Sequence, residues 1–175
     1  MKILPKTLIL SPLFCFSKKR LFEEIAETAS QELSIPQEKL IKSLDNREKL
    51  GSTILFDGIA LPHAAINSEE NKSCAILSIL NKPISFNSID ATPQHIDIAF
   101  AFFISKDQKY SDVEMMLKKL SQILSSSDLL NAMRLARNEI NKLNQIINKI
   151  DDMLSKEDPK PDTEEQGIDE KSIEE

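Results

Sequence analysis

Apolar residues recur at helical spacing near the start of the chain. Between Lys18 and Leu33 they return every three or four positions, which predicts an amphipathic helix with Ser17 as its N-cap. The inward positions are Leu21, Phe22, Ile25, Ala26 and Ala29. The preceding segment, 1–16, carries two lysines and a short apolar run, but Pro5 and Pro12 interrupt it. We interpret it as the first structural segment and not as a signal peptide.

A second helix is predicted after Pro36, which suits a first helical turn. Its inward positions are Leu40, Ile41 and Leu44. Arg47 lies at the C-terminal end of this helix, where a positive charge interacts favourably with the helix dipole. That interaction alone would account for the arginine, so a functional role needs further support.

Two later segments, 74–80 and 97–104, are almost continuously apolar. They are short for buried helices, so we expect central strands covered on both faces. Segments 54–56 and 58–61 are shorter extended pieces, and apolar spacing predicts another helix over about 110–125. This order of elements predicts an α/β fold, a single domain over residues 1–154 with a small mixed β-sheet flanked by helices on both sides.

The C-terminal region carries a longer apolar stripe with steps of four and three residues. Its members are Leu129, Met133, Ala136, Ile140, Leu143, Ile147, Ile150 and Leu154. Heptad spacing of this kind fits a pair of helices packed on the domain's own sheet. It also fits a coiled-coil seam, so self-association through the stripe is an alternative.

Charge is distributed unevenly along the chain. The net charge is −6, and the final segment, 156–175, accounts for all of it with nine acidic and three basic residues. We expect residues 155–175 to form a disordered acidic tail that aids solubility, because the segment has little apolar surface to bury. A neutral body with an acidic tail argues against nucleic-acid binding, which needs a basic surface.

Other classes of protein are disfavoured by composition. No apolar run reaches the roughly 20 residues that a membrane span needs, and we expect a cytoplasmic protein. Cys15 and Cys74 are too few and too far apart for a disulfide framework or a zinc site, so both are predicted to be buried thiols. Neither a metal nor a cofactor is expected.

The segment 47–64 carries the candidate chemistry. Gly51 and Gly58 are two of only three glycines, and we expect sharp turns at both. Pro62 favours an extended conformation at Leu61, so His63 is predicted at the end of a short strand. A lone histidine in such a context more often closes a turn than performs chemistry.

The sequence motif around His63 changes that assessment. Its pattern, R-E-x-x-G-S-T followed by G-I-A-x-P-H, resembles the phosphorylation-site signature of type-2 enzyme IIA domains of the bacterial phosphotransferase system (PTS). The matching positions are Arg47-Glu48, Gly51-Ser52-Thr53 and Gly58-Ile59-Ala60-Leu61-Pro62-His63. Two flanking segments, 17–20 and 83–90, are similar to the nitrogen-related branch of the family. The resemblance runs from about Leu8 to about Ile150.

This resemblance implies that His63 accepts a phosphoryl group from an HPr-like phosphocarrier, forming a phosphohistidine intermediate. An imidazole with a pKa of about 6.5 is unprotonated near neutral pH, as a nucleophile must be. Arg47 is then expected to bind the phosphoryl oxygens with its planar fork. Ser52 and Thr53 would support the site, and the family mechanism uses no metal.

The sequence departs from the family pattern in two places. Related domains usually carry a second histidine at the start of the helix after the central strands, where this chain has Asp112-Val113-Glu114. Asp112 or Glu114 could orient the imidazole by accepting its other N–H, or could repel an incoming phosphoryl group. Segment 54–57 is also more apolar than is usual. His95 matches no family site and is predicted to be a surface residue before a strand.

Three functions remain open at this stage. The favoured one is a free-standing, nitrogen-type enzyme IIA that is phosphorylated on His63 and binds regulatory targets according to its phosphorylation state. Because the sequence shows no enzyme IIB or transporter segment, regulation is favoured over sugar uptake. The second function keeps the same chemistry but donates the phosphoryl group to a separate fructose- or mannitol-type enzyme IIB. The third is a binding module with impaired phosphotransfer, in keeping with the missing second histidine.

Overall fold

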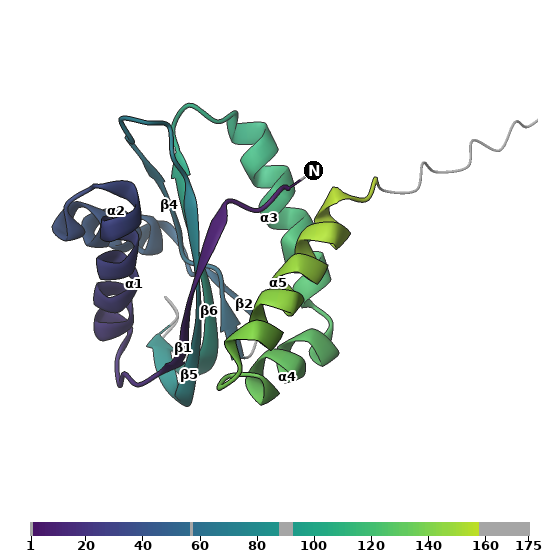
Figure 1. The fold of residues 1–175 in the computed structure, drawn as a ribbon. Coiled ribbons are helices and arrows are strands. Elements are labelled where there is room, and N and C mark those ends of the chain that lie inside the picture. Colours follow the sequence, from purple (N-terminus) through teal and green to yellow (C-terminus); the bar gives the residue numbers. More distant parts are fainter. Residues whose placement is uncertain (1, 57, 88–92, 158–175) are drawn as a thin grey trace, which may run out of the picture.

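The fold is built on one mixed β-sheet of six strands (Figure 1). The computed structural model describes residues 2–56, 58–87 and 93–157. The strands are β1 (Lys6–Leu13), β2 (Ile54–Phe56), β3 (Gly58–Ala60), β4 (His63–Ile66), β5 (Cys74–Asn87) and β6 (Pro93–Ser105). Their order is β1-β5-β6-β3-β2, and β4 also pairs with β6. Among the described residues, the β5–β6 and β2–β3 pairs are antiparallel and the other pairs are parallel.

Helices cover both faces of this sheet (Figure 1). On one face lie α1 (Lys18–Leu33) and α2 (Gln37–Leu50). On the other lie α3 (Tyr110–Leu124), α4 (Ser127–Leu135) and α5 (Ile140–Ser155). The predicted mixed α/β fold is therefore confirmed. Within the described residues, none of these helices is long and apolar enough to cross a bilayer.

The central strands read as continuous apolar runs because each of their faces contributes to a different core. In β6, Ala101 and Phe103 pack in the core beneath α1 and α2, whereas Phe100 and Phe102 pack beneath α3, α4 and α5. Successive side chains of a strand point to opposite faces, so a strand covered on both sides needs apolar residues at every position. Each fully buried Phe or Leu contributes roughly 1.5–3 kcal/mol relative to an exposed one.

The C-terminal stripe belongs to the second of these cores. Seven of its members are buried there, namely Leu129, Met133, Ala136, Leu143, Ile147, Ile150 and Leu154. The remaining member, Ile140, is 58% exposed at the start of α5. The helix α4 ends at Leu135 and α5 begins at Ile140, and the buried members of the stripe pack on the domain's own sheet.

Several smaller predictions can be compared with the structure. Segment 1–16 contributes β1 at an edge of the sheet, as the interpretation of a structural segment requires. Cys15 and Cys74 are both buried and free, and burial raises the pKa of Cys74 to about 12. Most of the predicted acidic tail, 158–175, lies outside the described residues, as do Asp57 and segment 88–92.

One buried carboxylate was not anticipated from the sequence. Asp151 of α5 accepts hydrogen bonds from the backbone N–H groups of Ile3 and Leu4, at 2.8 and 2.7 Å. These bonds tie the start of the chain to the last helix across 148 and 147 positions of sequence.

Replacing this carboxylate should therefore destabilise the fold. We expect Asp151→Ala to lower the free energy of unfolding by about 1–3 kcal/mol, because it leaves the N–H of the buried Leu4 without its partner. Urea denaturation measures the change. Asp152→Ala removes an exposed carboxylate from the next position and serves as the control. Equal losses in both variants would contradict the assigned role.

Candidate functional site

The imidazole of His63 lies at the start of β4 and is half-buried. The strand joins β6 here, because Phe102 N–H donates to the Pro62 carbonyl at 2.9 Å and His63 is the register partner of Phe102. His63 Nδ1 is 2.9 Å from the Leu61 carbonyl oxygen, so Nδ1 carries the proton and donates it. The lone pair of the neutral ring is therefore on Nε2.

Arg47 approaches that lone pair from the last turn of α2. Its Nε donates to His63 Nε2 at 3.1 Å, and Nη1 donates to the Gly51 carbonyl at 2.9 Å. The structure thus brings together the two residues that the sequence predicted to act together. The guanidinium is held between the imidazole and the loop that follows α2, and it retains further N–H donors.

The surroundings lower the pKa of His63 below its ordinary value. Burial is the largest cause, and the positive charge of Arg47 acts in the same direction. The hydrogen bond to the Leu61 carbonyl and the negative charge of Glu48 oppose these effects. The ring is therefore neutral near neutral pH and presents an unprotonated Nε2, which is the state that a nucleophile needs.

Glu48 is a site residue to which the sequence reasoning gave no role. Its side chain is 8% exposed, and its Oε2 is 2.9 Å from Lys18 Nζ. Its Oε1 accepts a short hydrogen bond from the Thr53 hydroxyl. Glu48 thereby fixes the end of α2 both to α1 and to the segment that leads into β2. The adjacent Arg-Glu pair of the motif was the only signal for it.

Within the described residues, no hydrogen bond joins the Ser52 or Thr53 side chain to the imidazole. The Thr53 hydroxyl is engaged by Glu48, and the Ser52 hydroxyl accepts the Ile54 N–H at 3.2 Å. Thr53 contributes through its backbone as well, since its carbonyl accepts the Leu61 N–H at 2.9 Å. Both residues thus shape the segments around His63, and Thr53 acts on the site through Glu48.

The acidic residues predicted to replace a second histidine do not lie against the ring. Asp112 and Glu114 are exposed in α3, and no hydrogen bond or ion pair joins either carboxylate to His63 in the described part of the chain. The orienting role predicted for them belongs to the Leu61 carbonyl, because it already accepts Nδ1–H. His95 is exposed as predicted, but it lies within β6, opposite Ser85, and not before the strand.

The two glycines of the segment differ. Gly58 has a φ of 96°, which favours glycine, and an added Cβ would lie 2.6 Å from Arg134 Nη2. That arginine forms a two-pronged pair with Asp97, at 2.7 and 2.9 Å, beside the start of β3. Gly51 ends α2 in an extended conformation, and its N–H donates to the Glu48 carbonyl at 3.2 Å. The expected need for glycine therefore holds only at Gly58.

No cluster of three or more His, Cys, Asp or Glu side chains suited to a metal ion occurs among residues 2–56, 58–87 and 93–157. What the described groups provide is a neutral imidazole with one nitrogen oriented by backbone and the other beside a guanidinium. Such an arrangement suits a histidine that takes up an anionic group at Nε2, because the cation lies where the negative charge would arrive.

Comparison with known proteins identifies the family of this α/β domain. The model of the family described as "Phosphoenolpyruvate-dependent sugar phosphotransferase system, EIIA 2" matches residues 2–150. The chain therefore belongs to the EIIA 2 family of that system. This membership supports a phosphoryl-carrier, regulatory role.

Individual relatives agree with this assignment. The nitrogen regulatory protein of Escherichia coli K12 is 32% identical over 137 residues, which are 78% of this chain and 82% of that protein. The crystal structure of nitrogen regulatory protein IIA-Ntr from Neisseria meningitidis superposes with a TM-score of 0.63 at 27% identity, covering 72% and 84% of the two chains. The mannitol enzyme IIA of Escherichia coli, solved in complex with phosphorylated enzyme IIB, superposes with a TM-score of 0.61 at 12% identity. The superposition covers 81% of this chain and 94% of that chain, and it shows a likeness of fold alone.

The opposite charges beside His63 allow a test of this geometry. Arg47→Met should raise the pKa of His63, because a positive charge that disfavours the imidazolium is removed, whereas Glu48→Gln should lower it further. NMR titration of the imidazole protons measures both shifts. Lys49→Gln changes an exposed residue of the same helix and should leave the pKa unaltered. Shifts of the same sign in the Arg47 and Glu48 variants would refute the arrangement.

Proposed function

We propose that His63 Nε2 accepts a phosphoryl group from an HPr-like phosphocarrier and that the chain regulates target proteins according to its phosphorylation state. The observation that carries this proposal is the 3.1 Å contact between the Arg47 guanidinium and Nε2, made while Nδ1 is bound to the backbone. Family membership and the printed names of the relatives support it.

The transfer requires no acid or base from the protein. The Nε2 lone pair attacks phosphorus, and the bond from phosphorus to the donor's nitrogen breaks with its electron pair returning to the donor ring. His63 keeps its Nδ1 proton and becomes a phosphorylated imidazolium. The Leu61 carbonyl stabilises the positive ring through the existing hydrogen bond, which strengthens as the ring gains charge.

Arg47 acts on the other partner in this step. Before transfer its Nε donates a hydrogen bond to the Nε2 lone pair. That bond is released when the lone pair attacks phosphorus, and the guanidinium N–H groups can then donate to the three phosphoryl oxygens. The charge of a transferring phosphoryl group is spread over those oxygens, so a fixed cation with several donors stabilises the transition state. Glu48 and Thr53 keep that cation in place through the end of α2.

None of the described helices is long and apolar enough to span a membrane. We propose that the protein acts in the cytoplasm, where a soluble phosphocarrier can reach His63. The regulatory part of the proposal rests on the relatives named nitrogen regulatory proteins. Delivery to an enzyme IIB remains compatible with the same chemistry, because the phosphorylated imidazolium can pass the group on by the reverse step.

Phosphorylation can be tested with the second histidine as a matched control. The protein is incubated with phosphoenolpyruvate, enzyme I and an HPr-like carrier, and intact mass is measured before and after acid treatment. We expect an acid-labile gain of one phosphate in the wild type and in His95→Ala, and no gain in His63→Ala. A wild-type protein that stays unmodified, or a gain that survives in His63→Ala, would leave a binding-only module as the better description.

A further inference from the structure

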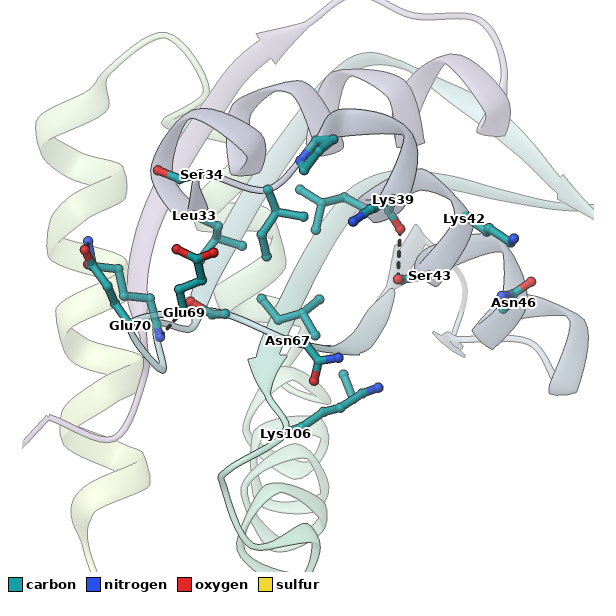
Figure 2. A pocket seen from close by; sticks show the side chains of 17 residues that line it. Leu33, Ser34, Lys39, Lys42, Ser43, Asn46, Asn67, Glu69, Glu70 and Lys106 are labelled. Carbon is teal, nitrogen blue, oxygen red and sulfur yellow. Dashed lines mark hydrogen bonds and ion pairs between the residues drawn. The ribbon is translucent and has the colours of Figure 1, made fainter.

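A groove of about 460 Å³ runs beside the candidate site (Figure 2). One wall is α2, which contributes Lys39, Lys42 and Asn46. The other wall is β4 with the connection that follows it, including Ala65. The turn between α1 and α2 closes one end, where Ser34 is drawn in Figure 2, while Asn46 lies toward the opposite end.

The charge of this groove differs from that of the whole chain. Four lysines and two glutamates line it, although the chain carries a net charge of −6. Glu70 pairs with Lys72 at 2.5 Å, and Glu69 lies beside that pair at the Ser34 end. Lys39, Lys42 and Lys106 form no ion pair with any residue that the structure describes. The groove is therefore a basic surface with three exposed ammonium groups that lack a described partner.

The wall formed by β4 is the open edge of a strand. In the described residues β4 pairs with β6 alone, and the carbonyls of Pro62 and Ile66 point toward β6, where they accept N–H groups at 2.9 Å. Backbone groups alternate in direction along a strand, so the N–H and C=O groups of His63 and Ala65 point away from the sheet. An edge of this kind can pair with an extended segment of another chain, and the small side chain of Ala65 allows close approach.

Two residues that line the groove are close neighbours of the site residues in sequence. Asn46 precedes Arg47 on α2, and Ala65 follows His63 by two positions on β4. At a rise of roughly 3.3 Å per residue, Ala65 lies about 7 Å from His63 along the strand. This separation is shorter than the Debye length of about 8 Å at physiological ionic strength, so charge on the imidazole is felt within the groove.

We propose that this groove binds an extended, acidic segment of a regulatory partner protein, which adds to the edge of β4 and places its carboxylates near Lys39, Lys42 and Lys106. The proposal rests on the proposed function, for which it supplies a mechanism of readout. A phosphoryl group brings roughly two negative charges. Because the ring becomes an imidazolium, the net change beside the groove is about one negative charge, carried on oxygens that extend from the ring. The phosphoryl group would repel the carboxylates of the segment and engage Arg47, so the unphosphorylated protein is the form that binds.

The binding can be tested with a defined probe. We would titrate a synthetic peptide of about ten residues that alternates Glu and Val, a strand-forming pattern, into the intact labelled chain and follow backbone amide shifts by NMR. The largest shifts are expected at Ala65 and along α2. The double variant Lys39→Gln/Lys42→Gln should weaken binding about three- to tenfold, as expected for the loss of two exposed ion pairs. The matched control Lys118→Gln/Lys149→Gln removes equal charge from α3 and α5 and should bind normally.

Two further measurements separate the parts of the proposal. A peptide N-methylated at alternate residues cannot form the backbone bonds of an added strand and should not bind. Phosphorylation of His63 should weaken the binding of the peptide that carries no N-methyl groups. This measurement is interpreted only after mass spectrometry has confirmed that the protein carries the phosphate. Failure of phosphorylation would count against the proposed function, while peptide binding to the unmodified protein tests the groove independently.

Several results would overturn the proposal. Equal affinity in the groove and control variants would show that the lysines are not used, and binding of the N-methylated peptide would exclude strand addition. Binding that appears only after deletion of 158–175 would show that the chain's own acidic segment occupies the groove. A dimer lost on Lys39→Gln/Lys42→Gln in light scattering would assign the groove to a second copy.

Discussion

The geometry at His63 depends on the way Glu48 fixes the end of α2. Arg47 can meet the imidazole only if this helix end stays beside the start of β4. A buried carboxylate is costly to remove from water unless both oxygens are paired, and here Lys18 satisfies one and Thr53 the other. Lys18 also lies 4.5 Å from the centroid of Phe86, which anchors it against α1's side of the core. The Glu48 side chain thereby joins α1, α2 and the segment that leads to His63.

The chemistry of the imidazole follows from two contacts with opposite effects. Arg47 and burial favour the neutral ring, whereas the Leu61 carbonyl favours the proton on Nδ1. Together they keep the ring uncharged and still define which nitrogen is the acceptor. The backbone supplies the orienting bond from only two residues away, so the correct tautomer does not depend on any distant side chain.

Much of the fold could be predicted from the sequence because its signals are local. The spacing of Leu21, Phe22 and Ile25 and the N-cap Ser17 gave α1 its bounds, and continuous apolar runs marked the two central strands. Strand lengths were underestimated. The strand β5 continues to Asn87 and β6 begins at Pro93, and these added stretches mix polar with apolar residues. The C-terminal stripe was ambiguous because heptad spacing does not say which surface covers it.

The site was predicted less completely than the fold. His63 and Arg47 were found through a contiguous motif, and the structure places them in contact. The network of Glu48 with Lys18 and Thr53 spans 30 and 5 positions, so no periodicity could reveal it. Asp112 and Glu114 were assigned by analogy to a position in the family pattern. In the structure the partner of Nδ1 is a backbone carbonyl, which sequence patterns do not show.

The lack of a second histidine has a specific consequence for this site. Because the Leu61 carbonyl already orients Nδ1, the missing residue is not needed to set the tautomer. In the described part of the chain Arg47 is the one cation within hydrogen-bond distance of Nε2. Under the proposed function, stabilisation of an incoming phosphoryl group would therefore fall to a single guanidinium. Its placement by Glu48 is correspondingly more important, because no other described charged side chain at Nε2 can compensate if the end of α2 shifts.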